Sequence, residues 1–79
     1  MLAIEENLIY IKDSSFINKM FYNDKTLTLY VLFQNGITYK YANVTGKEFL
    51  KFVKLKEDGS AVGKLFSSKI KNSKEFIKF

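Results

Sequence analysis

The sequence predicts an α+β domain in which a small antiparallel sheet of three to four strands packs against two helices on one face. The first reason is a β-hairpin. Residues 27–41 read LTLYVLFQNGITYKY, two alternating apolar runs joined by Asn35-Gly36, the strongest short-range signal for a hairpin. The second reason is that apolar residues after the hairpin follow helical spacing in two successive segments. At 79 residues the chain has room for one domain, residues 1–79.

Two strands are expected before the hairpin. Residues 1–11 are interpreted as an N-terminal strand with its extension, because an apolar run ends at Lys12-Asp13. Ser14-Ser15 separates this run from the second strand, and Asn23-Asp24-Lys25 is typical of a turn after it. The four predicted strands span residues 8–11, 16–22, 26–34 and 37–42.

The loop at Asn35-Gly36 decides which side chains share a face of the sheet, and two loop lengths fit the sequence. In a two-residue type I′ loop, Gln34 would face Ile37. One face would then contain Tyr30, Leu32, Tyr39 and Tyr41, and the other Leu29, Val31, Phe33 and Lys40.

In a three-residue loop, Gly36 would be left-handed in a G1 bulge and Phe33 would face Ile37. The inner, apolar face would then contain Leu29, Val31, Phe33, Ile37, Tyr39 and Tyr41, and the outer face Thr28, Gln34, Thr38 and Lys40. A one-residue slip exchanges the two faces, so only one register can hold. The second register gives the cleaner alternation and is favoured, but it leaves Tyr30 and Leu32 on the outer face, where they need cover.

A capping box predicts the start of the first helix. Thr45 can cap the helix and Glu48 can reach back to it, while Val44 and Phe49 match the hydrophobic staple. Phe49 and Phe52 share one side of this helix, so both rings are expected to point at the sheet.

Asp58-Gly59-Ser60 is expected to end the first helix and to start the second. The apolar face of the second helix would contain Val62, Leu65, Phe66 and Ile70. The chain ends in Phe76-Ile77-Lys78-Phe79, which is too apolar to stay in solvent, so residues 72–79 are expected to dock on the domain.

The positive charge of the chain comes from lysine alone and gathers in its later half. Ten of the 13 lysines lie from residue 37 onward, against four acidic residues. The chain has no His, the side chain that titrates near neutrality, and no Cys, so thiolate metal ligands are missing. It also has no Arg, whose planar guanidinium group reads guanine edges. No cofactor or metal is therefore expected. No apolar run approaches a membrane span and the N-terminus lacks a secretory signal pattern, which predicts a cytoplasmic protein without a membrane partner.

Short motifs follow one another in a defined order along residues 12–71. They are Ser14-Ser15-Phe16-Ile17, Tyr22, Leu29-Tyr30-Val31-Leu32-Phe33, Asn35-Gly36, Tyr39-Lys40-Tyr41, Val44, Phe49, Phe52, Ser60, Gly63-Lys64, Phe66 and Ile70. In this order and spacing they resemble the KTSC domain family, whose Y-x-Y motif is matched by Tyr39-Lys40-Tyr41. KTSC domains occur as stand-alone bacterial and phage proteins and at the C-terminus of some lysyl-tRNA synthetases. The resemblance implies a small α+β module with a suggested RNA-binding role and no known catalytic activity.

Tyr39, Lys40 and Tyr41 are the first candidate binding residues. On an exposed surface the two rings would form a platform on which nucleic-acid bases stack, each contributing about 1–3 kcal/mol. In the favoured register the rings instead point into the core, and Lys40 alone faces solvent. The accessibility of the two rings decides between these interpretations.

The lysines of the two helical segments are the second candidate. Lys47, Lys51 and Lys54 recur at helical spacing in the first segment, and Lys64, Lys69 and Lys71 belong to the second. They would either hold phosphates or form a solvated face that keeps the domain soluble. If about four phosphates are neutralised, log K should fall against log salt with a slope of about −3 to −4.

Two functions are compatible with these residues. The first is a non-catalytic nucleic-acid-binding module for RNA or single strands, driven by backbone phosphates and with weak sequence specificity. The alternative is a protein-interaction module, such as a phage-encoded inhibitor of an acidic partner or a self-associating adaptor, with Tyr30, Leu32 and Lys40 at the contact. No enzyme activity is expected, because the adjacent carboxylate pairs Glu5-Glu6 and Glu57-Asp58 lie near a terminus and at a turn, without the burial that acid–base chemistry needs.

Overall fold

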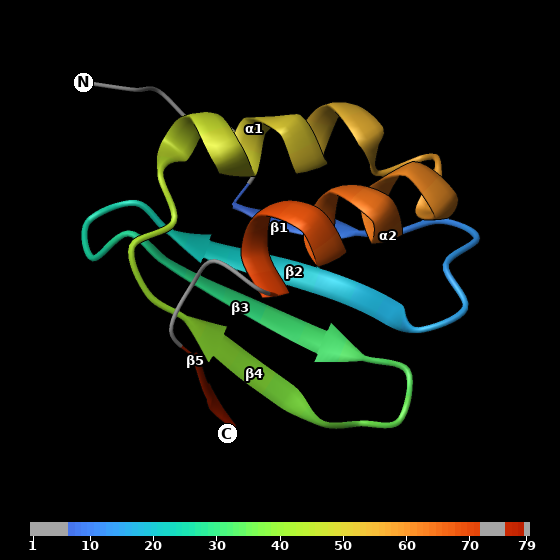
Figure 1. Ribbon diagram of the computed structural model, residues 1–79, viewed down its shortest axis with the longest axis horizontal. Helices are drawn as coiled ribbons and strands as arrows, with labels where there is room; N and C mark the ends of the chain where they lie inside the picture. The colour runs from blue at the N-terminus through green and yellow to red at the C-terminus, as the bar shows by residue number, and fades with distance from the viewer. Residues whose placement is uncertain (1–6, 72–75, 79) are drawn as a thin grey trace.

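The computed structural model describes residues 7–71 and 76–78 (Figure 1). In chain order the elements are β1 (Leu8–Tyr10), β2 (Ile17–Asn23), β3 (Thr28–Phe33), β4 (Thr38–Tyr41), α1 (Gly46–Leu55), α2 (Gly59–Phe66), η1 (Ser67–Lys71), which is a turn of π-helix, and β5 (Phe76–Lys78). Both helices lie on the same side of one sheet (Figure 1). The predicted α+β class, with an antiparallel sheet and two helices on one face, is confirmed.

The strands lie side by side in chain order, and each is antiparallel to its neighbour. The first four correspond to the four predicted strands. β5 comes from the C-terminal tail and pairs with β4, so the sheet has one strand more than the three to four expected. Residues 1–6 of the expected N-terminal extension, and residues 72–75 and 79 of the tail, lie outside the described residues.

The β3–β4 hairpin adopts the favoured register. The amide of Phe33 donates to the carbonyl oxygen of Ile37 at 2.9 Å, and the amide of Gly36 donates to the carbonyl oxygen of Phe33 at 3.0 Å. Gly36 is left-handed, with φ of 87°, as a G1 bulge requires. The loop therefore has three residues, and Leu29 and Val31 point into the core.

Thr28 is buried, with 6% of its surface exposed, although the sequence places it on the outer face of the sheet. The turn before β3 folds against it: the Thr26 hydroxyl donates to the Thr28 hydroxyl oxygen at 3.0 Å. Leu27, between them, has a left-handed φ of 55°. The alternation of side chains predicted the direction of the Thr28 side chain correctly but not the turn that covers it.

A β-bulge in β2 changes the alternation of that strand. The pairing of β2 with β3 shifts between Ile17 and Lys19. An extra residue in one strand moves the following side chains to the opposite face. Ile17 and Met20 consequently both point into the core, although they are three positions apart and regular alternation would place them on opposite faces.

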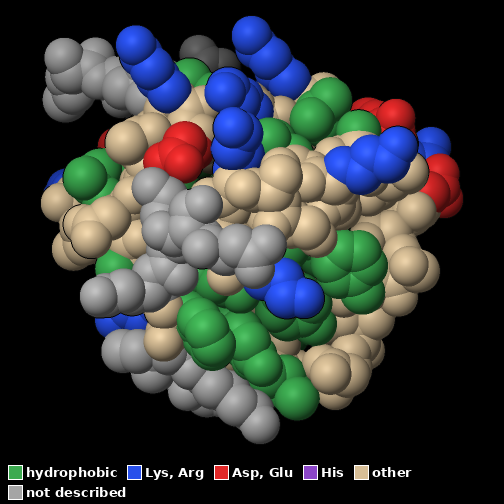
Figure 2. Space-filling model, viewed as in Figure 1, with side chains coloured by type: hydrophobic (Ala, Val, Ile, Leu, Met, Phe, Trp, Pro, Cys, Tyr) green, Lys and Arg blue, Asp and Glu red, His purple; other side chains and the backbone are tan. Residues whose placement is uncertain are grey.

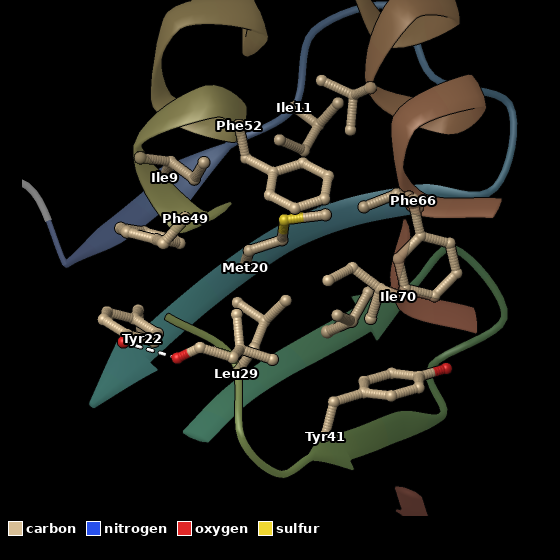
Figure 3. Packing of buried hydrophobic residues seen from close by; sticks show 14 residues of the cluster. Ile9, Ile11, Met20, Tyr22, Leu29, Tyr41, Phe49, Phe52, Phe66 and Ile70 are labelled. Atoms are coloured by element: carbon tan, nitrogen blue, oxygen red, sulfur yellow. Dashed lines mark hydrogen bonds between the residues drawn. The ribbon is translucent and has the colours of Figure 1, made fainter. Parts of the chain in front are cut away.

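The core lies between the sheet and the helical layer (Figure 3). It holds buried side chains from β1–β4 and both helices, the largest being Tyr22, Tyr41, Phe49, Phe52 and Phe66. The predicted capping box is present: the Thr45 hydroxyl accepts from the amide of Glu48 at 3.2 Å, and a Glu48 carboxylate oxygen accepts from the amide of Thr45 at 2.9 Å. None of the described helices is long and apolar enough to span a bilayer.

Tyr22 shows how a polar group is satisfied in this core. Its ring stacks on Phe49 with centroids 4.8 Å apart, and its hydroxyl donates to the carbonyl oxygen of Val44 at 2.6 Å (Figure 3). Burial, followed by the charges of Asp24 and Glu48, raises the pKa of this hydroxyl. The hydrogen bond joins β2 to the segment before α1 and helps to hold the helix on the sheet.

Candidate nucleic-acid interface

Tyr41 does not form part of an exposed stacking platform. Only 2% of its surface is exposed, and its ring packs edge-on against Phe66 with centroids 5.5 Å apart. Tyr39 is half-buried and stacks on Phe76 at 5.2 Å with an interplanar angle of 1°. The ring of Tyr41 is therefore not accessible to a stacking base, because the three-residue hairpin loop turns both tyrosines toward the helical layer.

The burial of Tyr41 predicts a loss of stability at high pH. Burial, followed by the nearby Tyr39, raises the pKa of Tyr41 to about 12. An unfolded tyrosine ionises near pH ~10, so this contribution to the free energy of unfolding is fully present below about pH 10 and is lost as the pH rises toward 12, roughly 2–3 kcal/mol in all. Denaturant unfolding at about pH 9 to 11.5 should therefore show a steeper loss for the wild type than for Tyr41→Phe, which has no hydroxyl to ionise. Equal pH dependence of the two proteins would contradict this assignment.

The lysines of α1 lie in solvent as predicted. Lys47, Lys51 and Lys54 are all exposed, and Figure 2 shows lysine side chains gathered over α1. Lys51 borders a small hollow of about 140 Å³ between α1 and η1, and Lys69 of η1 borders the same hollow. The fold thus brings together two lysines that are far apart in the sequence.

The remaining predicted lysines are exposed but belong to other surfaces. Lys64 borders a hollow of about 640 Å³ between α2 and residues 13–16, which also contains Asp13, a carboxylate that opposes anion binding. Lys71 borders a separate groove near β4 and β5. Within the described part of the chain, none of these lysines or those of α1 forms an ion pair. The helical layer is therefore positively charged, but its lysines do not converge on one site.

Eight side chains cover the side of the sheet away from the helices, and we call this surface the outer face. They form two rows that run across the strands. One row is Leu8, Phe21, Tyr30 and Lys40. The other row is Tyr10, Lys19, Leu32 and Thr38. Tyr30, Leu32 and Lys40, which the sequence predicts as a partner-binding set, are thus part of a larger surface.

The outer face exposes aromatic rings beside lysines. Tyr10 is 64% exposed and Phe21 is 43% exposed. The rings of Phe21 and Tyr30 lie 5.9 Å apart at 45°. The Lys19 ammonium lies 5.6 Å from the centre of the Tyr10 ring, and the Lys40 ammonium 5.9 Å from that of Tyr30, both within cation–π range. A shallow hollow of about 170 Å³ lies between the two rows.

Five residues of the outer face were not identified as candidates from the sequence: Leu8, Tyr10, Lys19, Phe21 and Thr38. A signal for them was present, because Phe21 alternates with the core residues Met20 and Tyr22. That signal becomes informative only when the pairing of Phe21 with Tyr30 is known, because pairing across strands places the two rings together. In the described residues, no three His, Cys, Asp or Glu side chains are grouped so that they could hold a metal ion.

Comparison with known proteins identifies the domain. The model of the KTSC domain family matches residues 13–76. The chain belongs to the KTSC domain family. This confirms the resemblance predicted over about residues 12–71. A search of the curated proteins finds no match for the chain.

The fold of this KTSC domain is also similar to a solved structure. The crystal structure of a KTSC domain protein from Yersinia pestis superposes with a TM-score of 0.72 at 24% sequence identity. The match covers 87% of this chain and 92% of the Yersinia pestis chain. This similarity concerns the fold alone.

The Y-x-Y motif of this KTSC domain crosses the sheet. Tyr39 and Tyr41 point to the helix-bearing side, where they contact Phe76 and Phe66. Lys40, between them, points to the outer face, above the ring of Tyr30. The motif therefore contributes aromatic rings to one surface and a positive charge to the opposite one.

Proposed function

We propose that this KTSC domain is a non-catalytic module that binds single-stranded nucleic acid, RNA in particular, on its outer face. The observation that carries the proposal is the exposure of Tyr10 and Phe21 beside Lys19 and Lys40, on a surface whose eight residues include no acid. A cytoplasmic location is part of the same proposal, since RNA and single strands are accessible there.

Stacking on flat rings and attraction to phosphates together suit a single strand. Each base stacked on an exposed ring contributes about 1–3 kcal/mol, and any base can stack because each has a π-face. Lysines act as point charges on the phosphates and do not read base edges in the bidentate manner of arginine. Sheets with exposed aromatic residues bind RNA in this way in other folds. The expected binding is therefore salt-dependent and weakly sequence-specific.

The helical lysines and the outer face do not serve one short strand together, because the sheet lies between them (Figure 1). Lys47, Lys51 and Lys54 are instead expected to raise the rate of association through the long-range field of the domain. The salt dependence separates the two surfaces. On a single strand, each neutralised phosphate contributes about −0.7 to the slope of log K against log salt. Binding by Lys19 and Lys40 therefore predicts a slope near −1.4, whereas binding by the six helical lysines predicts a slope near −4.

Fluorescence anisotropy with a labelled single-stranded oligouridine at about 50 mM salt tests the proposal. We expect Tyr10→Ser combined with Phe21→Ser to weaken binding about hundredfold or more, because the substitutions remove the two side-chain rings on which bases stack. Leu27→Ser is the matched control, since Leu27 is 41% exposed and lies in the β2–β3 turn, away from the outer face. Its affinity should equal that of the wild type.

Two results would count against the proposal. An absence of detectable binding at about 50 mM salt would reject nucleic-acid binding altogether. A loss of binding in Lys51→Glu combined with Lys54→Glu, with no loss in the aromatic double variant, would move the site to the helical layer. Circular dichroism of each variant shows whether the domain remains folded.

The second candidate function is protein interaction through the same outer face. It is favoured by Leu8 and Leu32, whose aliphatic side chains extend the apolar surface around Tyr30 and Lys40. Exposed apolar patches of this kind commonly form protein interfaces. Light scattering at rising protein concentration would reveal self-association, and Leu32→Lys should abolish it.

A further inference from the structure

A second concave surface lies on the helix-bearing side of the sheet. It is a groove of about 950 Å³ that is bordered by residues of β3, β4, α2, η1 and β5, and we call it the aromatic groove. Volumes of roughly 300–1,000 Å³, mostly apolar walls and a few polar groups are typical of small-ligand sites. The aromatic groove combines all three features.

Six rings line the aromatic groove: Phe16, which stacks on Phe33, and five that contact one another in a closed circuit. In order around the circuit they are Phe33, Tyr39, Phe76, Tyr41 and Phe66. Consecutive ring centroids lie 5.3, 5.2, 5.7, 5.5 and 5.8 Å apart. Rings that pack against one another are held in place before a ligand arrives, and their faces and edges favour a flat, conjugated ligand.

Tyr41 brings a hydroxyl group without a protein partner to this groove. Its ring is 2% exposed and runs below Ile70 and Phe66, with the hydroxyl pointing away from the core cluster (Figure 3). Unlike the hydroxyl of Tyr22, it makes no hydrogen bond with any described residue. The hydroxyl is not among the buried polar atoms without a partner, so it reaches solvent at the groove and is free to hydrogen-bond a ligand there.

The rim of the groove is polar and its charge is positive. Among the residues that the structure describes, Lys71 is the one charged residue that borders the groove, and it forms no ion pair with them. Asn35, also at the rim, accepts from the amide of Ile37 through its Oδ1 at 3.0 Å, which leaves its side-chain amide nitrogen to donate. An anionic group would complement this rim.

We propose that the aromatic groove binds a planar heteroaromatic ring joined to an anionic group, the chemistry of a nucleoside monophosphate. The base lies against the accessible parts of Phe33, Tyr39 and Phe76, with its polar edge at the Tyr41 hydroxyl and the Asn35 amide. The phosphate lies at Lys71. This site is separate from the outer face, which is on the other side of the sheet, so either proposal can fail without the other.

Isothermal titration calorimetry of the whole chain with adenosine 5′-monophosphate tests the site. Adenosine and ribose 5-phosphate are the comparison ligands, because each lacks one half of the proposed chemistry. We expect saturable binding of the monophosphate, binding of adenosine about tenfold weaker, and no detectable binding of ribose 5-phosphate. Lys71→Gln should weaken monophosphate binding about tenfold and leave adenosine binding unchanged, whereas Tyr41→Phe should weaken both about tenfold.

Lys69→Gln is the matched control, since it removes the same charge from η1 at a residue that does not border the groove. It should bind the monophosphate as the wild type does, and so should Phe21→Ser on the outer face. The proposal is overturned if the monophosphate shows no saturable binding, if Lys71→Gln and Lys69→Gln weaken it equally, or if ribose 5-phosphate binds as tightly as the monophosphate.

Discussion

Phe52→Ala should leave the domain largely unfolded near physiological temperature. Phe52 lies on α1 and is 1% exposed, with its ring directed toward Met20 of β2 (Figure 3). Removing a buried phenylalanine ring costs about 3–5 kcal/mol, because apolar contacts are lost and a cavity remains. A domain of 79 residues has a free energy of unfolding near the lower end of the usual range of about 5–15 kcal/mol. The substitution therefore removes most of its stability.

Thermal denaturation followed by circular dichroism measures this effect. A loss of about 3 kcal/mol should lower Tm by at least about 12 °C. Lys54→Ala is the matched control, because Lys54 is exposed on the same helix, and its stability should change by no more than about 0.5 kcal/mol. A Tm of Phe52→Ala within a few degrees of the wild type would mean that α1 does not pack on the sheet through this ring.

Gly59→Ala should destabilise the domain by about 3 kcal/mol or more. A Cβ atom at Gly59 would lie 2.4 Å from the backbone nitrogen of Ser14 and 2.5 Å from the carbonyl carbon of Asp13. These are backbone atoms, so either the loop between β1 and β2 or the start of α2 would have to move. In an exposed helix the same change usually stabilises, because alanine has the higher helix propensity. The expected sign is therefore opposite to that of helix propensity.

Two neighbouring substitutions make the Gly59 prediction specific. Ser60→Ala, at the next and exposed position, should change the free energy of unfolding by no more than about 0.5 kcal/mol. Gly63→Ala should have an intermediate cost, since its Cβ would lie 3.1 Å from the ring of Phe16, an exposed side chain that can move aside. Chemical denaturation should rank the losses as Gly59 above Gly63 above Ser60. A stability of Gly59→Ala equal to that of Ser60→Ala would contradict the close approach.

Elements that depend on short-range chemistry could be predicted from the sequence. Thr45 and Glu48 form the capping box three residues apart, and Gly36 supplies the left-handed conformation that the hairpin loop needs. Because these interactions involve residues close together in the sequence, their pattern can be recognised without knowledge of the fold. β5 was harder to predict from the sequence, because it is a short strand that follows η1 and pairs with the edge of β4.

The candidate site was harder to predict than the fold. Tyr39 and Tyr41 were considered as stacking residues on the basis of their motif, whereas Tyr41 is in the core and Lys40 alone reaches the outer face. The exposed rings of Tyr10 and Phe21 come from two other strands. Their proximity depends on strand pairing, which joins residues that are separated along the chain.

The sequence by itself determined the α+β class, the helix starts, the hairpin and the excess of lysine in the later half, because each follows from composition or from residues within a few positions of one another. The tertiary structure alone decided between the two hairpin registers and showed which sides of β1 and β2 are buried. Both helices follow β1–β4 in the chain and cover one face of the sheet, leaving the outer face exposed (Figure 1). That choice depends on apolar burial between distant segments, and it separates the lysines of the helical layer from the exposed aromatic rings.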